Sequence, residues 1–180
     1  MQNIKEKNDM AKRQVFFSFH YASDNWRAAQ VKNMGIVDNS STWSSNDWEE
    51  VRYKSDAKIK EWIDGQMTKR SCIVVLIGKS TSSRKWVKYE IQKAYELGKG
   101  IVGVYIHGLK DADGNQTTKG ANPFYSLYNK DGHRLSNYVE CYDPPHSTST
   151  YVYNDIKENL GDYIERAIDT PIIAVISGRQ

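Results

Sequence analysis

Runs of apolar residues mark the predicted strands along the chain. Residues 14–19 (QVFFSF) are β-branched or aromatic at most positions, which is typical of a strand. Residues 72–77 (CIVVLI) and 101–106 (IVGVYI) are almost entirely apolar, as expected of parallel strands that are covered on both faces. Shorter runs at 36–38 and 138–142 indicate two further strands. We therefore expect five strands, with the most apolar of them, 72–77, near the middle of the sheet.

Segments with helical periodicity separate these strands. A first helix is predicted to end near Gly35, and Ser55 can cap a second helix whose apolar residues recur every three or four positions. Two more helices are predicted over 83–97 and 150–168. The polar segment 39–54 shows no apolar period and is expected to be a long loop. This alternation predicts an α/β fold with three layers, in which helices cover both faces of an open, five-stranded, mainly parallel sheet.

The chain of 180 residues is predicted to form one domain, because it has no internal repeat and no low-complexity linker. Residues 1–13 are polar and are expected to form a flexible N-terminal tail. The domain is expected to span 14–170. Residues 171–180 are expected to form a C-terminal tail, to which the pattern assigns no role.

Composition and charge exclude several classes of protein. The 25 Lys and Arg against 22 Asp and Glu form no basic cluster, so we expect no nucleic-acid partner. No apolar run approaches the ~20 residues that span a bilayer, and the N-terminus lacks the apolar segment of a secretion signal, so a cytoplasmic protein without a membrane partner is expected. The two cysteines and four histidines lack metal-ligand spacing, so no metal and no resident cofactor are expected. The aromatic content of 12% exceeds what a small core needs, which predicts aromatic residues on a surface or in a pocket.

One carboxylate falls on the apolar arc of the helix predicted over 83–97. With Trp86 at the origin and about 100° per residue, Glu90 lies about 40° away, between Trp86 and Ala94. A carboxylate on a buried face is costly unless it is paired or hydrogen-bonded. Two interpretations follow: Glu90 reaches solvent, Arg84 or a backbone amide at the rim, or it forms the wall of a pocket beside an indole.

Other candidate site residues lie where predicted strands end. In open parallel sheets, ligands bind beyond the carboxyl ends of the strands. Phe19 and His20 follow the first strand, and Asp38 follows the second. Trp43 and Trp48 belong to the segment predicted as a loop. This tryptophan pair could cover the edge of the sheet, form an aromatic wall for a flat ring, or contact a partner.

Three segments, taken together, resemble Toll/interleukin-1 receptor (TIR) domains. Residues 15–19 (VFFSF) resemble the first-strand box of the family, and residues 72–77 resemble its third strand. Residues 86–91 (WVKYEI) are similar to its third-helix motif, in which a Glu follows a Trp by four residues and precedes an aliphatic residue. The order and spacing of these segments imply a flavodoxin-like TIR fold.

A narrower resemblance is to the TIR-like subunit of bacterial Thoeris antiphage defence systems. It is carried by residues 16–21 (FFSFHY), 84–91 (RKWVKYEI) and 119–124 (KGANPF). The whole resemblance covers about residues 14–143. It implies a signalling enzyme that takes NAD⁺ as its substrate and cleaves the nicotinamide glycosidic bond. Capture of the ribosyl group by water would give ADP-ribose, and capture within the same molecule would give a cyclic isomer that activates a separate effector.

The resemblance also implies roles for individual residues. Glu90 would be catalytic, because the Glu of the third-helix motif has that role in enzymatic TIR domains. Phe19, His20 and Asp38 match substrate-contacting positions of the family, and Trp86 would form part of the wall near nicotinamide. Trp43 is the further candidate for substrate binding. Self-association through TIR-like surfaces is also implied.

The sequence departs from common TIR domains in ways that leave alternatives open. Residues 39–54 lack the Arg-Asp…Pro-Gly pattern of the family, and residues 107–137 form a long insertion. Arg84 stands where a Ser is common, two residues before the tryptophan of the helix motif. A non-catalytic TIR-like interaction module and another flavodoxin-like signalling domain are therefore kept as alternatives. An open cleft beside Glu90 would favour the enzyme, and a sealed Glu90 the interaction module.

Overall fold

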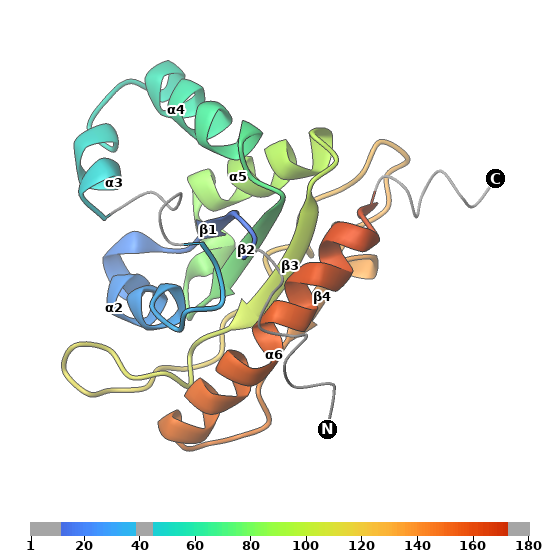
Figure 1. Ribbon diagram of the computed structural model, residues 1–180. Helices are drawn as coiled ribbons and strands as arrows, with labels where there is room; N and C mark the ends of the chain where they lie inside the picture. The colour runs from blue at the N-terminus through green and yellow to red at the C-terminus, as the bar shows by residue number, and fades with distance from the viewer. Residues whose placement is uncertain (1–11, 39–44, 173–180) are drawn as a thin grey trace.

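A parallel sheet of four strands runs through the middle of the structure, which is a computed structural model describing residues 12–38 and 45–172 (Figure 1). The strands lie side by side in chain order: β1 (Val15–Ser18), β2 (Cys72–Ile77), β3 (Gly100–Tyr105) and β4 (Glu140–Tyr142). Every neighbouring pair is parallel. All six residues of β2 and of β3 are buried, as the continuous apolar runs predicted. The expected interior position of β2 is confirmed.

The second predicted strand is absent from the described residues, so the expectation of five strands is wrong in this element. Residues 36–38 have no strand geometry. The Asp38 N–H donates a hydrogen bond to the Arg13 carbonyl at 3.0 Å, ahead of β1. Val37 is only 2% exposed, so this position is apolar because its side chain is buried in the hydrophobic core, and not because the residue pairs with a neighbouring strand. A run of three residues is too short for the pattern to distinguish these two cases.

Helices cover both faces of the sheet, as predicted for a three-layer fold. α6 (Ser149–Asp169) packs against β2 and β3 from one face, with α2 (Tyr21–Lys32) beside it (Figure 1). α5 (Lys85–Glu96) packs against the same two strands from the other face, and α4 (Asp56–Thr68) packs against α5. The part of the chain that the structure describes also has two short 3₁₀ helices, η2 (Thr81–Ser83) and η3 (Leu135–Asn137). The α/β, flavodoxin-like arrangement of the prediction is confirmed.

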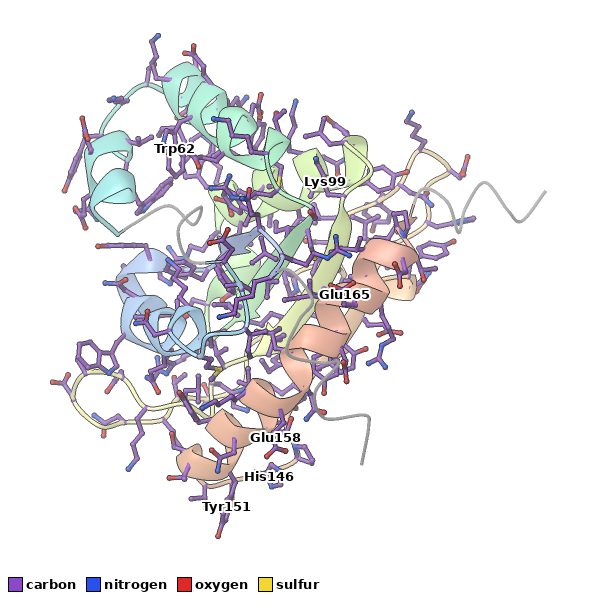
Figure 2. All side chains as sticks on the ribbon, in the orientation of Figure 1. Trp62, Lys99, His146, Tyr151, Glu158 and Glu165 are labelled. Carbon is purple, nitrogen blue, oxygen red and sulfur yellow. The ribbon has the colours of Figure 1, made fainter. Side chains whose placement is uncertain are left out.

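The segment predicted as a loop over 39–54 contains a helix, α3 (Ser45–Val51), so this prediction is wrong for its second half. The helix packs on α4: the Trp48 and Trp62 ring centroids are 6.1 Å apart, and Trp62 lies on the side of α4 that faces α3 (Figure 2). Val51 is also buried. Two apolar residues three positions apart were the only local signal, and tertiary packing supplies the rest. Ser55 caps α4 as predicted, since its hydroxyl oxygen accepts from the Lys58 N–H at 3.4 Å.

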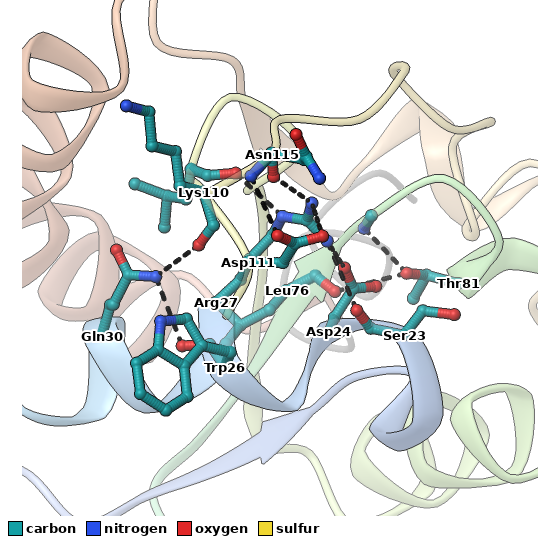
Figure 3. A network of polar contacts seen from close by, with 12 residues as sticks. Ser23, Asp24, Trp26, Arg27, Gln30, Leu76, Thr81, Lys110, Asp111 and Asn115 are labelled. Carbon is teal, nitrogen blue, oxygen red and sulfur yellow. Dashed lines mark hydrogen bonds and ion pairs between the residues drawn. The ribbon is translucent and has the colours of Figure 1, made fainter. Parts of the chain in front are cut away.

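A buried arginine attaches the long segment after β3 to α2 (Figure 3). Arg27 is 3% exposed, and its Nε donates to the Leu109 carbonyl at 2.8 Å while Nη2 donates to the Asn115 carbonyl at 2.8 Å. Its Nη1 donates to Asp24 Oδ1 at 2.9 Å. Desolvation raises the pKa of Asp24, and the bond from Arg27 opposes that rise. The ion pair is therefore a structural connection between α2 and the inserted loop.

Close backbone packing next to this ion pair fixes the carboxyl end of β2. A Cβ atom at Gly78, directly after β2, would clash with the Asp24 carboxylate. A Cβ atom at Gly120 would clash with the Gly78 carbonyl oxygen, so the inserted loop crosses directly over this turn. Glycine is required at both positions because a side chain has no room. The end of the sheet that follows β1 and β2 is thereby held in one arrangement.

Arg27→Ala is expected to destabilise the protein by about 3 kcal/mol or more, because it leaves Asp24 buried without its partner. The double variant Asp24→Leu/Arg27→Leu removes both charges and should recover part of that loss. Urea denaturation of the two variants and the wild type tests this. Equal losses in the single and the double variant would contradict the ion-pair account.

Candidate active site

A pocket of about 360 Å³ lies at the carboxyl end of β1. Its wall is built from three parts of the chain that are distant in sequence. They are residues 19–22, between β1 and the first turn of α2; Trp48 and Arg52, from α3 and the turn after it; and residues 84–87 with Glu90, from the start of α5. Binding beyond the carboxyl ends of parallel strands was expected for this architecture.

Glu90 projects from the inward face of α5 and lines this pocket. Glu90 is only 5% exposed. Of the two interpretations of the sequence, the structure therefore supports a carboxyl in the wall of a pocket over a carboxyl that reaches solvent at the rim. The Ser18 hydroxyl, fully buried at the last residue of β1, donates to Glu90 Oε2. Phe19, His20 and Trp86 line the same pocket. The predicted position of Glu90 beside these three residues is confirmed, and its role stays a prediction.

Burial dominates the electrostatics of Glu90. It raises the pKa of this carboxyl to about 8, and the hydrogen bond from Ser18 opposes the rise only in part. The carboxyl is therefore mostly protonated at neutral pH. A cationic ligand placed against it would favour the ionised form, because an opposite charge lowers the pKa of a carboxyl.

His20 presents a neutral imidazole to the same pocket. It occupies the N-cap position of α2, and burial together with the positive charge of Arg84 lowers its pKa. Its Nδ1 is buried and has no hydrogen-bond partner within residues 12–38 and 45–172. A neutral imidazole can donate one hydrogen bond and accept another, so His20 is suited to a hydroxyl group of a ligand.

Aromatic rings form much of the rest of the wall. Phe19 and Tyr21 are stacked, with ring centroids 6.4 Å apart and an interplanar angle of 30°. Trp86, in the first turn of α5, and Trp48, from α3, also line the pocket. Such a wall fits a flat ring, which was one of the functions considered for the tryptophans. The arrangement can accommodate a ligand that has a planar ring and hydroxyl groups.

Two predicted substrate-binding residues are not brought to this pocket by the described structure. Asp38 lies level with Arg13, before the first residue of β1, and the charge of Asp38 acts on Arg70, just before β2. Its expected position at the carboxyl end of the sheet is therefore wrong, because the segment that precedes it forms no strand along β1. Trp43 lies outside the described residues.

Sequence reasoning missed the functions that two other residues take in the site. Ser18 is the single polar residue of β1, and that contrast with its apolar neighbours is the signal that could have marked it as the partner of Glu90. Arg52 lines the pocket from a polar segment without periodicity, and no sequence signal identified it.

Among the described residues, no cluster of three His, Cys, Asp or Glu side chains could hold a metal ion. No helix in the described part of the chain is long and apolar enough to cross a membrane.

Glu90→Gln is expected to make the protein relatively more stable as pH rises. A carboxyl whose pKa is raised on folding stabilises the fold fully below its ordinary value of 4.5, and this contribution is lost as pH rises through about 8. Glutamine does not titrate, and its amide oxygen can still accept from Ser18. The difference in free energy of unfolding between variant and wild type should grow by ~1 kcal/mol or more from about pH 5 to about pH 9.

The matched control is Glu96→Gln, which removes a carboxylate from the exposed end of the same helix. Urea denaturation across this pH range should show no comparable change for the control. A Glu90→Gln difference that stays constant with pH would contradict the raised pKa.

The geometry agrees with two comparisons with known proteins. Residues 16–111, which contain Ser18, His20 and Glu90, match the family model described as "Thoeris protein ThsB, TIR-like domain". The chain is also 39% identical over 137 residues to a protein of Bacillus cereus (strain MSX-D12) named "Putative cyclic ADP-D-ribose synthase ThsB1". That alignment covers 72% of this chain and 71% of the relative. The chain therefore belongs to the TIR-like domain family of the Thoeris protein ThsB.

Proposed function

We propose that this protein cleaves the bond between nicotinamide and ribose in NAD⁺ and releases nicotinamide together with an ADP-ribose signal in antiphage defence. The observation that carries the proposal is the Glu90 carboxyl, buried in a pocket with an aromatic wall. The name of the Bacillus cereus relative, a cyclic ADP-D-ribose synthase, supports the same class of reaction. NAD⁺ is the substrate here and no resident cofactor is required.

Glu90 would stabilise the charge that develops on the ribose. The nicotinamide ring of NAD⁺ is cationic, and as the glycosidic bond breaks its positive charge moves onto the ribosyl group, which becomes oxocarbenium-like. A fixed carboxylate beside that group favours the transition state over the ground state. The cationic substrate itself would draw the Glu90 carboxyl into its ionised form, since an opposite charge lowers its pKa.

His20 and the aromatic wall would hold the reacting group in place. The neutral imidazole of His20 can hydrogen-bond a ribose hydroxyl, and Trp86 and Phe19 offer surfaces for the nicotinamide ring. Nicotinamide leaves as a neutral molecule, so the second carboxylic acid of ordinary glycosidases is not needed. This agrees with Glu90 being the single acidic residue in the wall formed by the described residues.

Capture of the ribosyl group decides the product. Attack by water gives ADP-ribose, and attack by an atom of the same molecule gives a cyclic isomer. The name of the relative favours the cyclic product. A nucleotide product of this kind would reach a separate effector by diffusion.

The pocket also favours an enzyme over the alternative of a non-catalytic interaction module. A module that only binds partner proteins has no need of a buried carboxyl facing an accessible pocket. Among the described residues Glu90 has the Ser18 hydroxyl as a partner and no cation in an ion pair, so its burial is costly, and a costly buried group is retained where function requires it.

Glu90→Gln is expected to lower the rate of nicotinamide release from NAD⁺ by ~10²–10³, because it removes the charge that faces the developing cation. Nicotinamide and ADP-ribose products are measured by chromatography, with and without extract from phage-infected cells as a source of activator. Glu96→Gln, on the same helix but outside the pocket, should keep the wild-type rate. Equal turnover by Glu90→Gln and wild type would remove Glu90 from the mechanism, and absence of turnover by wild type under all conditions would favour the interaction module.

Self-association through TIR-like surfaces, which the resemblance to enzymatic TIR domains implies, is expected to complete the active assembly. The candidate contact is the segment that carries Trp48 and Arg52 and that borders the pocket. Specific activity should then rise with protein concentration or with an activating factor. Activity assays over a dilution series test this. Specific activity that stays constant down to nanomolar protein would indicate a self-sufficient monomer.

A further inference from the structure

The charged residues of the pocket wall are mostly cationic. Arg52, Arg84 and Lys85 line it, and Glu90 is the acidic residue among the described lining side chains. Burial keeps the Glu90 carboxyl largely protonated at neutral pH, so it does not offset these positive charges. The pocket therefore has a positive potential, which suits an anionic group of a ligand.

Arg84 differs from the other two cations because, among the described side chains, it has no carboxylate partner. Lys85 forms an ion pair with Asp56, and Arg52 pairs with Glu49 at 3.0 Å. No carboxylate within the described ranges pairs with Arg84, whose Nε makes one long hydrogen bond of 3.4 Å to a backbone carbonyl oxygen. Its charge nevertheless acts on His20, whose pKa it lowers. Arg84 is thus an available guanidinium close to the imidazole in the pocket.

Backbone groups add to this positive potential. α5 begins immediately after Arg84 and α2 begins immediately after His20, and the side chain of neither N-cap residue makes a capping hydrogen bond. The first residues of both helices line the pocket. Uncapped N–H groups and the helix dipole favour negative charge at such positions. Together with the unpaired guanidinium, they point to an anion at the mouth of the pocket.

We propose that Arg84 binds the pyrophosphate of the dinucleotide while Glu90 faces the nicotinamide ribose. The proposal rests on the proposed function. Glu90 follows Arg84 by six positions, which corresponds to about 9 Å along a helix. Ribose carries its phosphate on the side away from the base, so a nicotinamide ribose beside Glu90 directs the phosphates toward the start of α5. Arginine can bind phosphate oxygens in a bidentate manner, which the serine common at this position in TIR domains cannot do.

This assignment makes Arg84 a residue that selects the dinucleotide over a nucleoside. The test measures equilibrium binding of two ligands, NAD⁺ and nicotinamide riboside, which lacks phosphate. Calorimetry is carried out on Glu90→Gln, whose slow turnover leaves the ligands intact, and on the double variants with Arg84→Ser, Arg84→Lys or Lys79→Ser. Lys79 is the matched control, because it carries the same charge on an exposed position near Arg84 but does not line the pocket.

Arg84→Ser is expected to raise the Kd for NAD⁺ about tenfold, the typical effect of losing a hydrogen bond to a charged group, and to leave the Kd for nicotinamide riboside unchanged. Arg84→Lys should lie between serine and arginine, because it keeps the charge without the bidentate geometry. Lys79→Ser should bind both ligands as the parent does. Added salt should weaken NAD⁺ binding more in the parent than in Arg84→Ser.

An unchanged NAD⁺ affinity in Arg84→Ser, or an equal loss for both ligands, would overturn this proposal. The proposed function would survive that result if wild type still released nicotinamide from NAD⁺. If wild type neither bound nor cleaved NAD⁺ under any activating condition, both proposals would be wrong. Thermal unfolding of each variant confirms that the exposed substitutions leave the fold intact.

Discussion

The arrangement of this site depends on one buried carboxyl. Glu90 lies on the inward face of α5, where a charged group is costly, and the Ser18 hydroxyl at the end of β1 is its hydrogen-bond partner. That contact joins the helix to the strand at the place where the pocket begins. The same burial raises the pKa of the carboxyl, so the group is mostly protonated at neutral pH, and a cationic ligand can shift it to the ionised form. The contact between α5 and β1 and the raised pKa of the carboxyl thus both follow from the burial of Glu90.

The surrounding structure keeps this carboxyl in position. Arg27 connects α2 to the loop that follows β3, and Gly78 and Gly120 allow that loop to cross the end of β2 without space for a side chain. These contacts hold in place the N-terminus of α2, which borders the pocket. Preorganisation of this kind is what electrostatic stabilisation requires, because groups that must move at the moment of reaction stabilise less.

The apolar pattern predicted the central strands and the position of Glu90 because both follow directly from periodicity and burial. β2 is apolar at every position, and the spacing from Trp86 to Glu90 fixes their common face on any helix. The pattern failed where packing between distant segments decides the structure. α3 exists because Trp48 packs on Trp62, and Asp38 lies at the amino end of the sheet because residues 36–38 form no strand. The charge balance of the pocket also depends on which cations find carboxylate partners, and spacing along the chain does not contain that information.

The Glu90 carboxyl is expected to keep its proton at neutral pH in the absence of a ligand and to lose it when a cationic ligand binds. ¹³C NMR of protein labelled at glutamate measures this directly, with the Glu90→Gln variant identifying the signal. The account predicts a titration midpoint of about 8 without ligand, and an ionised carboxylate at neutral pH when nicotinamide riboside is bound. A midpoint near the ordinary value of 4.5 that nicotinamide riboside does not change would contradict it.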